Sequence, residues 1–298
     1  MKQGQTGQTA DGDGARETGG GNRWLAVAWR IVRIPLIAYL LVMVVLMFFE
    51  ESIIFHPLKY PEGVWKVGGF EVEDAYFQAA DGTKLHGWYA PRENPRAVVL
   101  YCHGNAGNVT NRTEILRRLS QRTGVSVLIF DYRGYGRSEG KPSEAGVLAD
   151  ARAARAWLAQ REGIPKDEEA EKIVMMGRSL GGAVAVDLAA ADGARALVLE
   201  STFTSIPDMG THIYPWLPVR MFVRTRLDSL SKIGSYEGPL LQSHGDGDSI
   251  VPFQLGEKLF QAANEPKEFI PFKGLDHNDY QPIEYYDKLS EFFDQLPD

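Results

Sequence analysis

Hydrophobic and polar positions divide the chain into three parts of different character. Residues 1–22 are mostly Gln, Gly, Thr and Asp, with almost no large apolar side chain. Such a segment cannot offset the entropy lost on ordering, so we expect a disordered tail. Residues 23–50 are strongly apolar, and residues 51–298 alternate short apolar runs with amphipathic ones. The pattern predicts one folded domain that follows a hydrophobic segment.

The apolar segment contains an uncharged block of 16 residues, Ile34–Phe49. As a helix this block is about 24 Å long, somewhat less than a bilayer core of about 30 Å. A helix that begins at Trp24 has the required length. It includes Arg30 and Arg33, which are tolerated because their long side chains can direct the charges towards the headgroups. A buried core helix would carry a polar stripe, and a cleaved signal peptide would be followed by small residues rather than by Phe48-Phe49-Glu50-Glu51. We therefore predict a single transmembrane anchor over residues 23–50.

Charges on either side of the anchor differ in sign. The basic residues Arg16, Arg23, Arg30 and Arg33 lie before the uncharged block, whereas Glu50 and Glu51 follow it directly, with only Lys59 and Lys66 nearby. Because positive charge is retained on the cytoplasmic side, the N-terminus is expected in the cytoplasm. The domain is then expected on the outer, extracytoplasmic side, which in a bacterium is the periplasm.

The domain opens with a hairpin pattern and continues as alternating strands and helices. Two strand-like runs, Phe70–Gln78 and Thr83–Ala90, flank the turn signal Asp81-Gly82. Further strands are expected at 97–101, 125–130, 173–176, 196–199, 240–242 and 268–271, and helices at 115–119, 144–160, from 179, 253–263 and 283–293. This order predicts an α/β fold, a mostly parallel sheet with helices on both faces and catalytic groups at the carboxyl ends of its strands.

One irregular stretch, Ser201–Gly238, contains aromatic residues, prolines and three arginines. It is too long for a simple connection and suits a small lid. Its mixed Arg and apolar positions around 214–218 are more typical of lid packing than of a lipid-contacting surface. No internal repeat and no second domain boundary is evident.

Composition excludes several classes of protein. The whole chain carries a net charge of -7 and residues 1–49 carry +2, so residues 50–298 carry -9. An acidic domain without a basic stripe is a poor partner for nucleic acid. Cys102 is the only cysteine, which excludes an intramolecular disulfide and a zinc site built from thiolate pairs. The acidic run 167–171 is typical of a solvated loop rather than a metal site, and residues 134–142 lack the glycine spacing of phosphate and dinucleotide loops.

Residues Gly177–Gly181 read Gly-Arg-Ser-Leu-Gly and match the pattern G-x-S-x-G. They stand between a predicted strand and a predicted helix rich in Ala and Val. A serine on such a sharp turn projects its hydroxyl into the cleft, and the flanking glycines let the turn pack closely against neighbouring backbone. Ser179 is therefore the candidate nucleophile.

A nucleophilic serine needs a base, and the base needs an acid to orient it. Of the six histidines, His277 alone lies between the last predicted strand and the last predicted helix, where the order Ser, Asp, His places the base. Asp248 follows the strand at 240–242 and is the preferred acid, with Asp246 and Glu200 as alternatives. His103 and His244 each follow a strand and precede a glycine, so a tight turn and a local hydrogen bond explain them. The remaining histidines lie before the parallel strands, at His56 and His86, or in the predicted lid, at His212.

The reaction also requires two backbone N–H groups that bind the oxyanion. One is expected from Leu180, directly after the nucleophile. The second is expected from the loop 103–108, whose small residues allow close approach of backbone to substrate, and Asn105 is the preferred donor. The alternative is a glycine turn without a role.

Five motifs occur in the order found in one known family: HGNAGN at 103–108, DYRGYGRSEG at 131–140, GRSLGG at 177–182, HGDGDSIVP at 244–252 and GLDHND at 274–279. From about Phe70 to its end, the chain resembles the α/β-hydrolase superfamily. It is most similar to a branch of small membrane-anchored hydrolases that includes depalmitoylases and bacterial proteins described as hydrolases or serine peptidases. The resemblance implies that Ser179, Asp248 and His277 form the triad. Asp276 departs from the pattern, since many relatives have a small residue there.

The combined features predict a membrane-anchored serine hydrolase that needs neither a cofactor nor a metal. Its expected substrate is a small acyl ester or thioester, with a lipid-like molecule favoured by the anchor and the apolar lid. A peptidase that trims small peptides is the alternative within the same chemistry. A non-catalytic receptor or scaffold on the same fold is the alternative outside it, although such a protein would not need all three triad residues. The sequence does not determine the oligomeric state.

Overall fold

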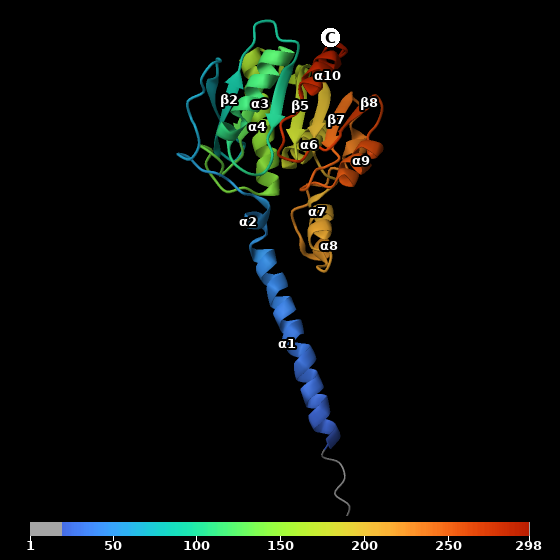
Figure 1. Ribbon diagram of the computed structural model, residues 1–298. Coiled ribbons are helices and arrows are strands. Elements are labelled where there is room, and N and C mark those ends of the chain that lie inside the picture. The colour runs from blue at the N-terminus through green and yellow to red at the C-terminus, as the bar shows by residue number, and fades with distance from the viewer. Residues whose placement is uncertain (1–19, 298) are drawn as a thin grey trace, which may run out of the picture. The chain divides into compact units, whose positions relative to one another are not determined.

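The computed structural model describes residues 20–297, with side chains from residue 23, so the tail predicted to be disordered lies almost wholly outside the described residues. The chain divides into two units, one up to Phe48 and one from Phe49. The first unit holds helix α1 (Gly20–Phe48), the blue helix in Figure 1, which continues through Pro35. Its part from Arg23 to Phe48 is long and apolar enough to cross a membrane.

The second unit is built on one sheet of eight described strands, in the order β1-β2-β4-β3-β5-β6-β7-β8. The strands are β1 (Glu73–Gln78), β2 (Lys84–Ala90), β3 (Val98–Cys102), β4 (Ser126–Asp131), β5 (Ile173–Arg178), β6 (Ala196–Glu200), β7 (Leu240–Gly245) and β8 (Lys267–Phe272). β1 and β2 form an antiparallel hairpin, β2 pairs antiparallel with β4, and all other neighbours are parallel. The predicted mostly parallel sheet with an antiparallel start is confirmed, although β1 begins at Glu73 rather than at Phe70.

The described α-helices of this unit are α2 (Glu50–Ile54), α3 (Thr113–Arg118), α4 (Glu144–Glu162), α5 (Glu169–Lys172), α6 (Leu180–Asp192), α7 (Ile206–Ile213), α8 (Val219–Phe222), α9 (Phe253–Ala262) and α10 (Ile283–Asp294). Their ends follow local signals, as in α4, where Ser143 accepts a hydrogen bond from the Gly146 N–H and Gly163 ends the helix with a φ of 68°. The stretch predicted to form a lid holds α7 and α8.

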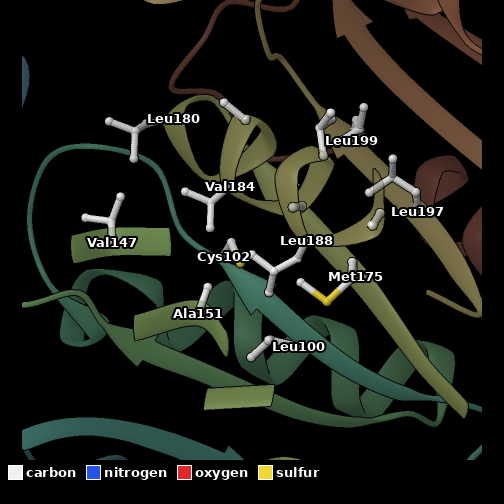
Figure 2. Close-up of a cluster of buried hydrophobic side chains, with 14 of the residues drawn as sticks. Leu100, Cys102, Val147, Ala151, Met175, Leu180, Val184, Leu188, Leu197 and Leu199 are labelled. Carbon is white, nitrogen blue, oxygen red and sulfur yellow. The ribbon is translucent and has the colours of Figure 1, made fainter. Parts of the chain in front are cut away.

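Hydrophobic residues cover both faces of the sheet, which explains why its strands are apolar without interruption. On one face, side chains of β3, β5 and β6 pack against α4 and α6, and Figure 2 shows Leu100 and Met175 beside Val184 and Leu188. On the other face, the alternate residues of the same strands pack against α3 and α10. The predicted helices on both faces are confirmed, and the rigid sheet fixes the loops at the carboxyl ends of its parallel strands.

Candidate active site

Ser179 occupies the sharp turn between β5 and α6. Its backbone has a φ of 53° and a ψ of -120°, a conformation that residues other than glycine rarely adopt. Two hydrogen bonds hold this strained turn: the Ser179 N–H donates to the Glu200 carbonyl at 2.9 Å, and the Thr202 hydroxyl donates to the Ser179 carbonyl at 2.8 Å. The half-buried serine is thereby fixed at the carboxyl end of the sheet.

The glycines around Ser179 have a steric reason. A Cβ atom on Gly181 would lie 1.9 Å from the Cys102 carbonyl oxygen and 2.5 Å from that of His103. A Cβ atom on Gly177 would lie 2.2 Å from the Gly181 carbonyl oxygen. Only glycine lets the first turn of α6 approach the end of β3 this closely. The motif is therefore required by the packing of backbone on backbone as well as by the chemistry.

The structure brings His277 and Asp248 together from two different loops. His277 follows β8 and Asp248 follows β7, and His277 Nδ1 lies 2.7 Å from Asp248 Oδ2. The other carboxylate oxygen, Oδ1, accepts the N–H groups of Ile250 at 3.0 Å and Val251 at 2.7 Å. His277 is 7% exposed. These contacts orient the imidazole and leave Nε2 as the nitrogen that can exchange a proton with substrate groups.

A second histidine, His244, contacts the same carboxylate. Its Nε2 lies 3.3 Å from Asp248 Oδ2 and 3.0 Å from the Val251 carbonyl oxygen, and the ring is fully buried. Burial by itself would raise the pKa of Asp248, but hydrogen bonds with His244 and His277 outweigh it and hold this pKa well below its usual range. Asp248 therefore stays ionised at neutral pH.

Sequence reasoning explained His244 by a turn and missed its contact with Asp248. The two residues are four positions apart across the tight turn that follows β7, and this spacing is the only signal that could have indicated the pair. Their contact depends on how the turn folds.

Two further residues hold the loop that carries His277. The Arg178 guanidinium donates hydrogen bonds to the carbonyl oxygens of His277 and, at 3.2 Å, of Asp279. Asp276 accepts the His277 N–H at 2.7 Å and both the N–H and the hydroxyl of Ser249, at 2.7 Å and 2.8 Å. Asp276, the departure from the family pattern, thus links the two loops that supply the candidate base and acid.

The alternative acids make different contacts. Asp246 accepts a hydrogen bond from the Gly274 N–H. Glu200 is buried with Tyr101, whose hydroxyl lies 3.3 Å from it, and burial raises the pKa of this carboxyl. Neither side chain forms a hydrogen bond with His277 in the described part of the chain, so Asp248 alone meets the geometric requirement for the acid.

The loop after β3 lies beside the serine. A Cβ atom on Gly104 would lie 3.5 Å from the Ser179 Cβ. Among the residues that the structure describes, the N–H groups of Asn105 and Leu180 donate to no acceptor. The Asn105 side chain is held elsewhere, because its Oδ1 accepts from the His56 N–H and from the Tyr135 hydroxyl, both at 3.0 Å. Asn105 and Leu180 therefore remain the candidate backbone donors for a substrate oxygen.

No hydrogen bond joins the Ser179 hydroxyl to His277 within the described residues. Such contacts are often long without substrate and tighten when it binds. No group of three or more His, Cys, Asp or Glu side chains suited to a metal ion occurs over residues 20–297. The arrangement places a candidate serine nucleophile, an imidazole oriented by a carboxylate and candidate backbone donors on neighbouring loops, the groups that acyl transfer to water requires.

Comparison with known proteins assigns the family. A family model described as "Serine aminopeptidase, S33" matches residues 93–234. The chain is 35% identical over 227 residues to WAV2 of Arabidopsis thaliana, an alpha/beta hydrolase domain-containing protein, with 70% of this chain and 72% of WAV2 covered. The chain belongs to the α/β-hydrolase superfamily. This α/β hydrolase is also 44% identical over 208 residues to an uncharacterized protein of Mycobacterium tuberculosis, with 69% and 72% of the two chains covered.

Solved structures agree with this fold. The α/β hydrolase described here matches the esterase Pf2001 of Pyrococcus furiosus with a TM-score of 0.66 and 21% sequence identity, covering 82% of this chain and 98% of the esterase. At this level of identity the likeness establishes the fold. Membership of the superfamily supports hydrolase activity.

Proposed function

We propose that this α/β hydrolase is a membrane-anchored serine hydrolase that cleaves acyl ester or thioester bonds of small, lipid-like molecules. Ser179 is the nucleophile, His277 the general base and Asp248 the acid that orients it. The observation that carries the proposal is the 2.7 Å contact between His277 Nδ1 and Asp248 Oδ2, on loops adjoining the strained Ser179 turn. All three groups lie on loops at the carboxyl ends of parallel strands, where this fold collects its chemistry.

In the first half of the reaction, Ser179 Oγ attacks the acyl carbon while His277 Nε2 takes the hydroxyl proton. A C–O bond forms to the serine, and the carbonyl oxygen becomes an oxyanion bound by the N–H groups of Leu180 and Asn105. Collapse of this intermediate breaks the bond to the alcohol or thiol, which leaves with the proton from His277. Asp248 stays ionised and stabilises the imidazolium that forms in between.

In the second half, water attacks the acyl-enzyme. His277 Nε2 takes a proton from the water, the oxyanion forms again against the same two N–H groups, and Ser179 leaves with the proton returned by His277. The products are a carboxylic acid and the free serine. Every proton in this cycle moves through one imidazole, so the geometry of the Asp248 contact controls both halves.

Helix α1 supports the membrane part of the proposal. Its candidate span Arg23–Phe48 has a mean hydropathy of 2.6, and only 6% of its most apolar window is buried within the protein. A core helix of this hydropathy would be buried. The small residues that a signal peptidase requires are missing after the span. We further propose that the domain lies on the extracytoplasmic side, because Arg23, Arg30 and Arg33 lie in the N-terminal part of the span, whereas Glu50 and Glu51 follow its end.

Labelling with a fluorophosphonate probe tests the nucleophile. The intact protein in detergent is compared with Ser179→Ala and with the control Ser231→Ala, which removes an exposed hydroxyl from the predicted lid. We expect labelling of the intact protein and of the control, and none of Ser179→Ala. Folded intact protein that resists the probe would overturn the proposal and favour the non-catalytic receptor or scaffold.

A serine peptidase is the second candidate, because the matching family model is described as a serine aminopeptidase. Both candidates use the same serine, so a substrate panel separates them. The panel contains p-nitrophenyl esters of different chain length, a long-chain acyl thioester and amino-acyl nitroanilides. Faster turnover of the nitroanilides would favour the peptidase, and turnover restricted to short esters would contradict the lipid-like substrate.

A further inference from the structure

The helices α7 and α8 present apolar side chains to solvent. Ile213, Trp216 and Met221 are 53%, 62% and 78% exposed. In the same segment Leu217 and Val219 are buried. The segment, residues 206–226, is called the cap. Its exposed apolar side chains, Ile213, Trp216 and Met221, define the cap surface.

The charge of this segment is opposite to that of the domain. Residues 206–226 contain three arginines and one aspartate, a net charge of +2, within a domain that is strongly acidic. Arg220 and Arg224 are exposed, and Arg220 forms an ion pair with Asp208 at 2.5 Å. The sequence pattern of this stretch favoured lid packing, but the structure leaves its large apolar side chains exposed. Exposed apolar side chains next to arginines are typical of surfaces that meet anionic lipid, because the rings and aliphatic chains enter the interface while the guanidinium groups remain at the headgroups.

The segment that follows α1 in the chain is bonded to this cap. Glu50, the first residue of α2, is 7% exposed, and its carboxylate accepts the N–H of Arg224 at 3.0 Å and the N–H of Thr225 at 2.6 Å. A side chain that accepts two backbone N–H groups makes a directional contact. Figure 1 shows α2, α7 and α8 at the same end of this unit.

The same segment is bonded to the candidate oxyanion loop. The Asn105 side-chain amide donates to the Ile54 carbonyl oxygen, and its Oδ1 accepts the His56 N–H at 3.0 Å. The Gly107 N–H donates to the His56 carbonyl oxygen at 3.3 Å. The cap and the candidate oxyanion loop are thus both attached to residues 50–56.

The number of intervening residues limits the distance between the end of the candidate span and the residues that hold the cap and the oxyanion loop. The span ends at Phe48, and Glu50 is two residues further along the chain. Two extended residues and the five-residue helix α2 together reach about 15 Å at most. Whatever Glu50 and Ile54 bind therefore lies close to the plane at which the chain leaves the bilayer.

We propose that the cap surface docks on the bilayer that holds α1, so that the site opens towards the lipid and takes its acyl substrate from the membrane. This inference rests on the membrane anchor proposed above. The occupant of the cap surface is the interfacial layer of the same membrane, with Met221 and Ile213 at the acyl boundary and Arg224 at anionic headgroups. The contacts of Glu50 and Asn105 hold the cap and the oxyanion loop at that surface.

Depth-dependent quenching tests the docking in the full chain. Single-cysteine variants in a Cys102→Ser background carry an environment-sensitive fluorophore at Met221→Cys or at Lys288→Cys, reconstituted in vesicles of phosphatidylcholine and phosphatidylglycerol. Lys288 belongs to α10, and Figure 1 shows this helix at the opposite end of the unit from α7 and α8. We expect spin-labelled lipid to quench the fluorophore at 221 and not at 288. Equal, weak quenching at the two sites would overturn the proposal.

A third label separates failure of the docking from failure of the anchor. Leu40→Cys places the fluorophore inside the candidate span. Lipid quenching at 40 without quenching at 221 would refute the docked cap and leave the anchor intact. Absence of quenching at 40 would refute the anchor and, with it, this inference. Shielding at 221 that depends on protein concentration and not on lipid would assign the surface to a second copy of the chain instead.

Turnover provides a readout in protein that keeps Cys102. The double variant Trp216→Ser and Met221→Glu is compared with the natural chain on a long-chain ester embedded in vesicles and on a soluble short-chain ester. We expect turnover of the embedded ester to fall about tenfold, the change produced when a large apolar side chain no longer enters lipid. Turnover of the soluble ester and labelling of Ser179 should be unchanged. An equal loss on both esters would indicate general damage and overturn the specific role of the surface.

Discussion

Replacement of Gly181 by alanine should damage the site without altering any of the proposed catalytic side chains. The added Cβ atom would lie 1.9 Å from the Cys102 carbonyl oxygen. A carbon and a carbonyl oxygen approach to about 3.3 Å without strain, so the two backbone segments must separate by about 1.4 Å. The obstructing atom belongs to β3, which pairs through Cys102 with Gly177 of β5, so no flexible side chain can absorb this displacement.

The cost follows from this geometry. Overpacking a well-packed core costs about 1–3 kcal/mol, and we expect the upper end because rigid backbone must move. For a domain of this size about 3 kcal/mol lowers the thermal midpoint by about 6–12 °C. The shift also moves Ser179 relative to its base and oxyanion donors, and a misplacement of about 1 Å can reduce the rate about 100-fold.

Two measurements on the full chain in detergent check this reasoning. Differential scanning fluorimetry gives the thermal midpoint, and the rate of fluorophosphonate labelling gives the reactivity of Ser179. The matched control is Gly68→Ala, because a Cβ at Gly68 meets no atom within 4 Å and its φ is not positive. We expect the control to behave as the natural chain. If Gly181→Ala has the same thermal midpoint and the same labelling rate as the natural chain, the proposed role of this close contact is refuted.

Three further predictions concern charged and titratable groups. Asp248→Asn should lower kcat for an ester about 10,000-fold, since the imidazole loses the partner that sets its tautomer, whereas Asp246→Asn should retain most activity in the same assay. Burial lowers the pKa of His103 from 6.5 to about 3. As the pH drops below 6.5, the unfolded chain therefore binds a proton at this residue before the folded chain does. The free energy of unfolding should then fall by about 1.4 kcal/mol per pH unit. Thermal midpoints between pH 7 and 4 should therefore change less in His103→Gln, and parallel profiles would contradict this assignment. Glu50→Ala should leave the backbone N–H groups of Arg224 and Thr225 without acceptors, at a cost of about 1–3 kcal/mol each. Hydrogen exchange of these two amides should therefore accelerate about tenfold or more. The control Glu51→Ala should leave their exchange unchanged.

The arrangement of strands and helices was predictable because apolar periodicity reports burial. The strand expected at 97–101 is Val98–Cys102, and the helix expected at 144–160 is Glu144–Glu162. Parallel strands covered on both faces must be apolar throughout, so their sequences stand out from the helices between them. The start of β1 was placed three residues too early, since an apolar pattern does not mark the point where hydrogen-bonded pairing begins.

The candidate site was predictable in part for a chemical reason. A serine nucleophile requires a base and an acid, and the order of the loops in this fold leaves few positions for them. Those positions are Ser179, Asp248 and His277, and the contact of the last two at 2.7 Å agrees with the requirement. Their catalytic roles remain a prediction until the labelling experiment.

The contacts that surround these residues were not predictable. His244 approaches Asp248 because a turn closes on itself, and Asp276 joins the loops of the base and the acid. Glu50 binds the N–H of Thr225 from 175 positions away in the chain. Side chains in such contacts have no periodic signature, because each can form many local hydrogen bonds and only the packed chain selects one.

The sequence by itself therefore determined the fold class and the apolar segment, and it named the candidate residues for acyl transfer. These properties depend on composition and on short-range pattern, both of which can be read from short stretches of the sequence. Only the tertiary structure decided that the Asp248 carboxylate has two histidine partners and that the residues after the apolar segment hold both the cap and the oxyanion loop. Such pairs arise when the sheet brings distant loops to one edge, and their energy depends on distances of a few ångströms that no linear pattern encodes.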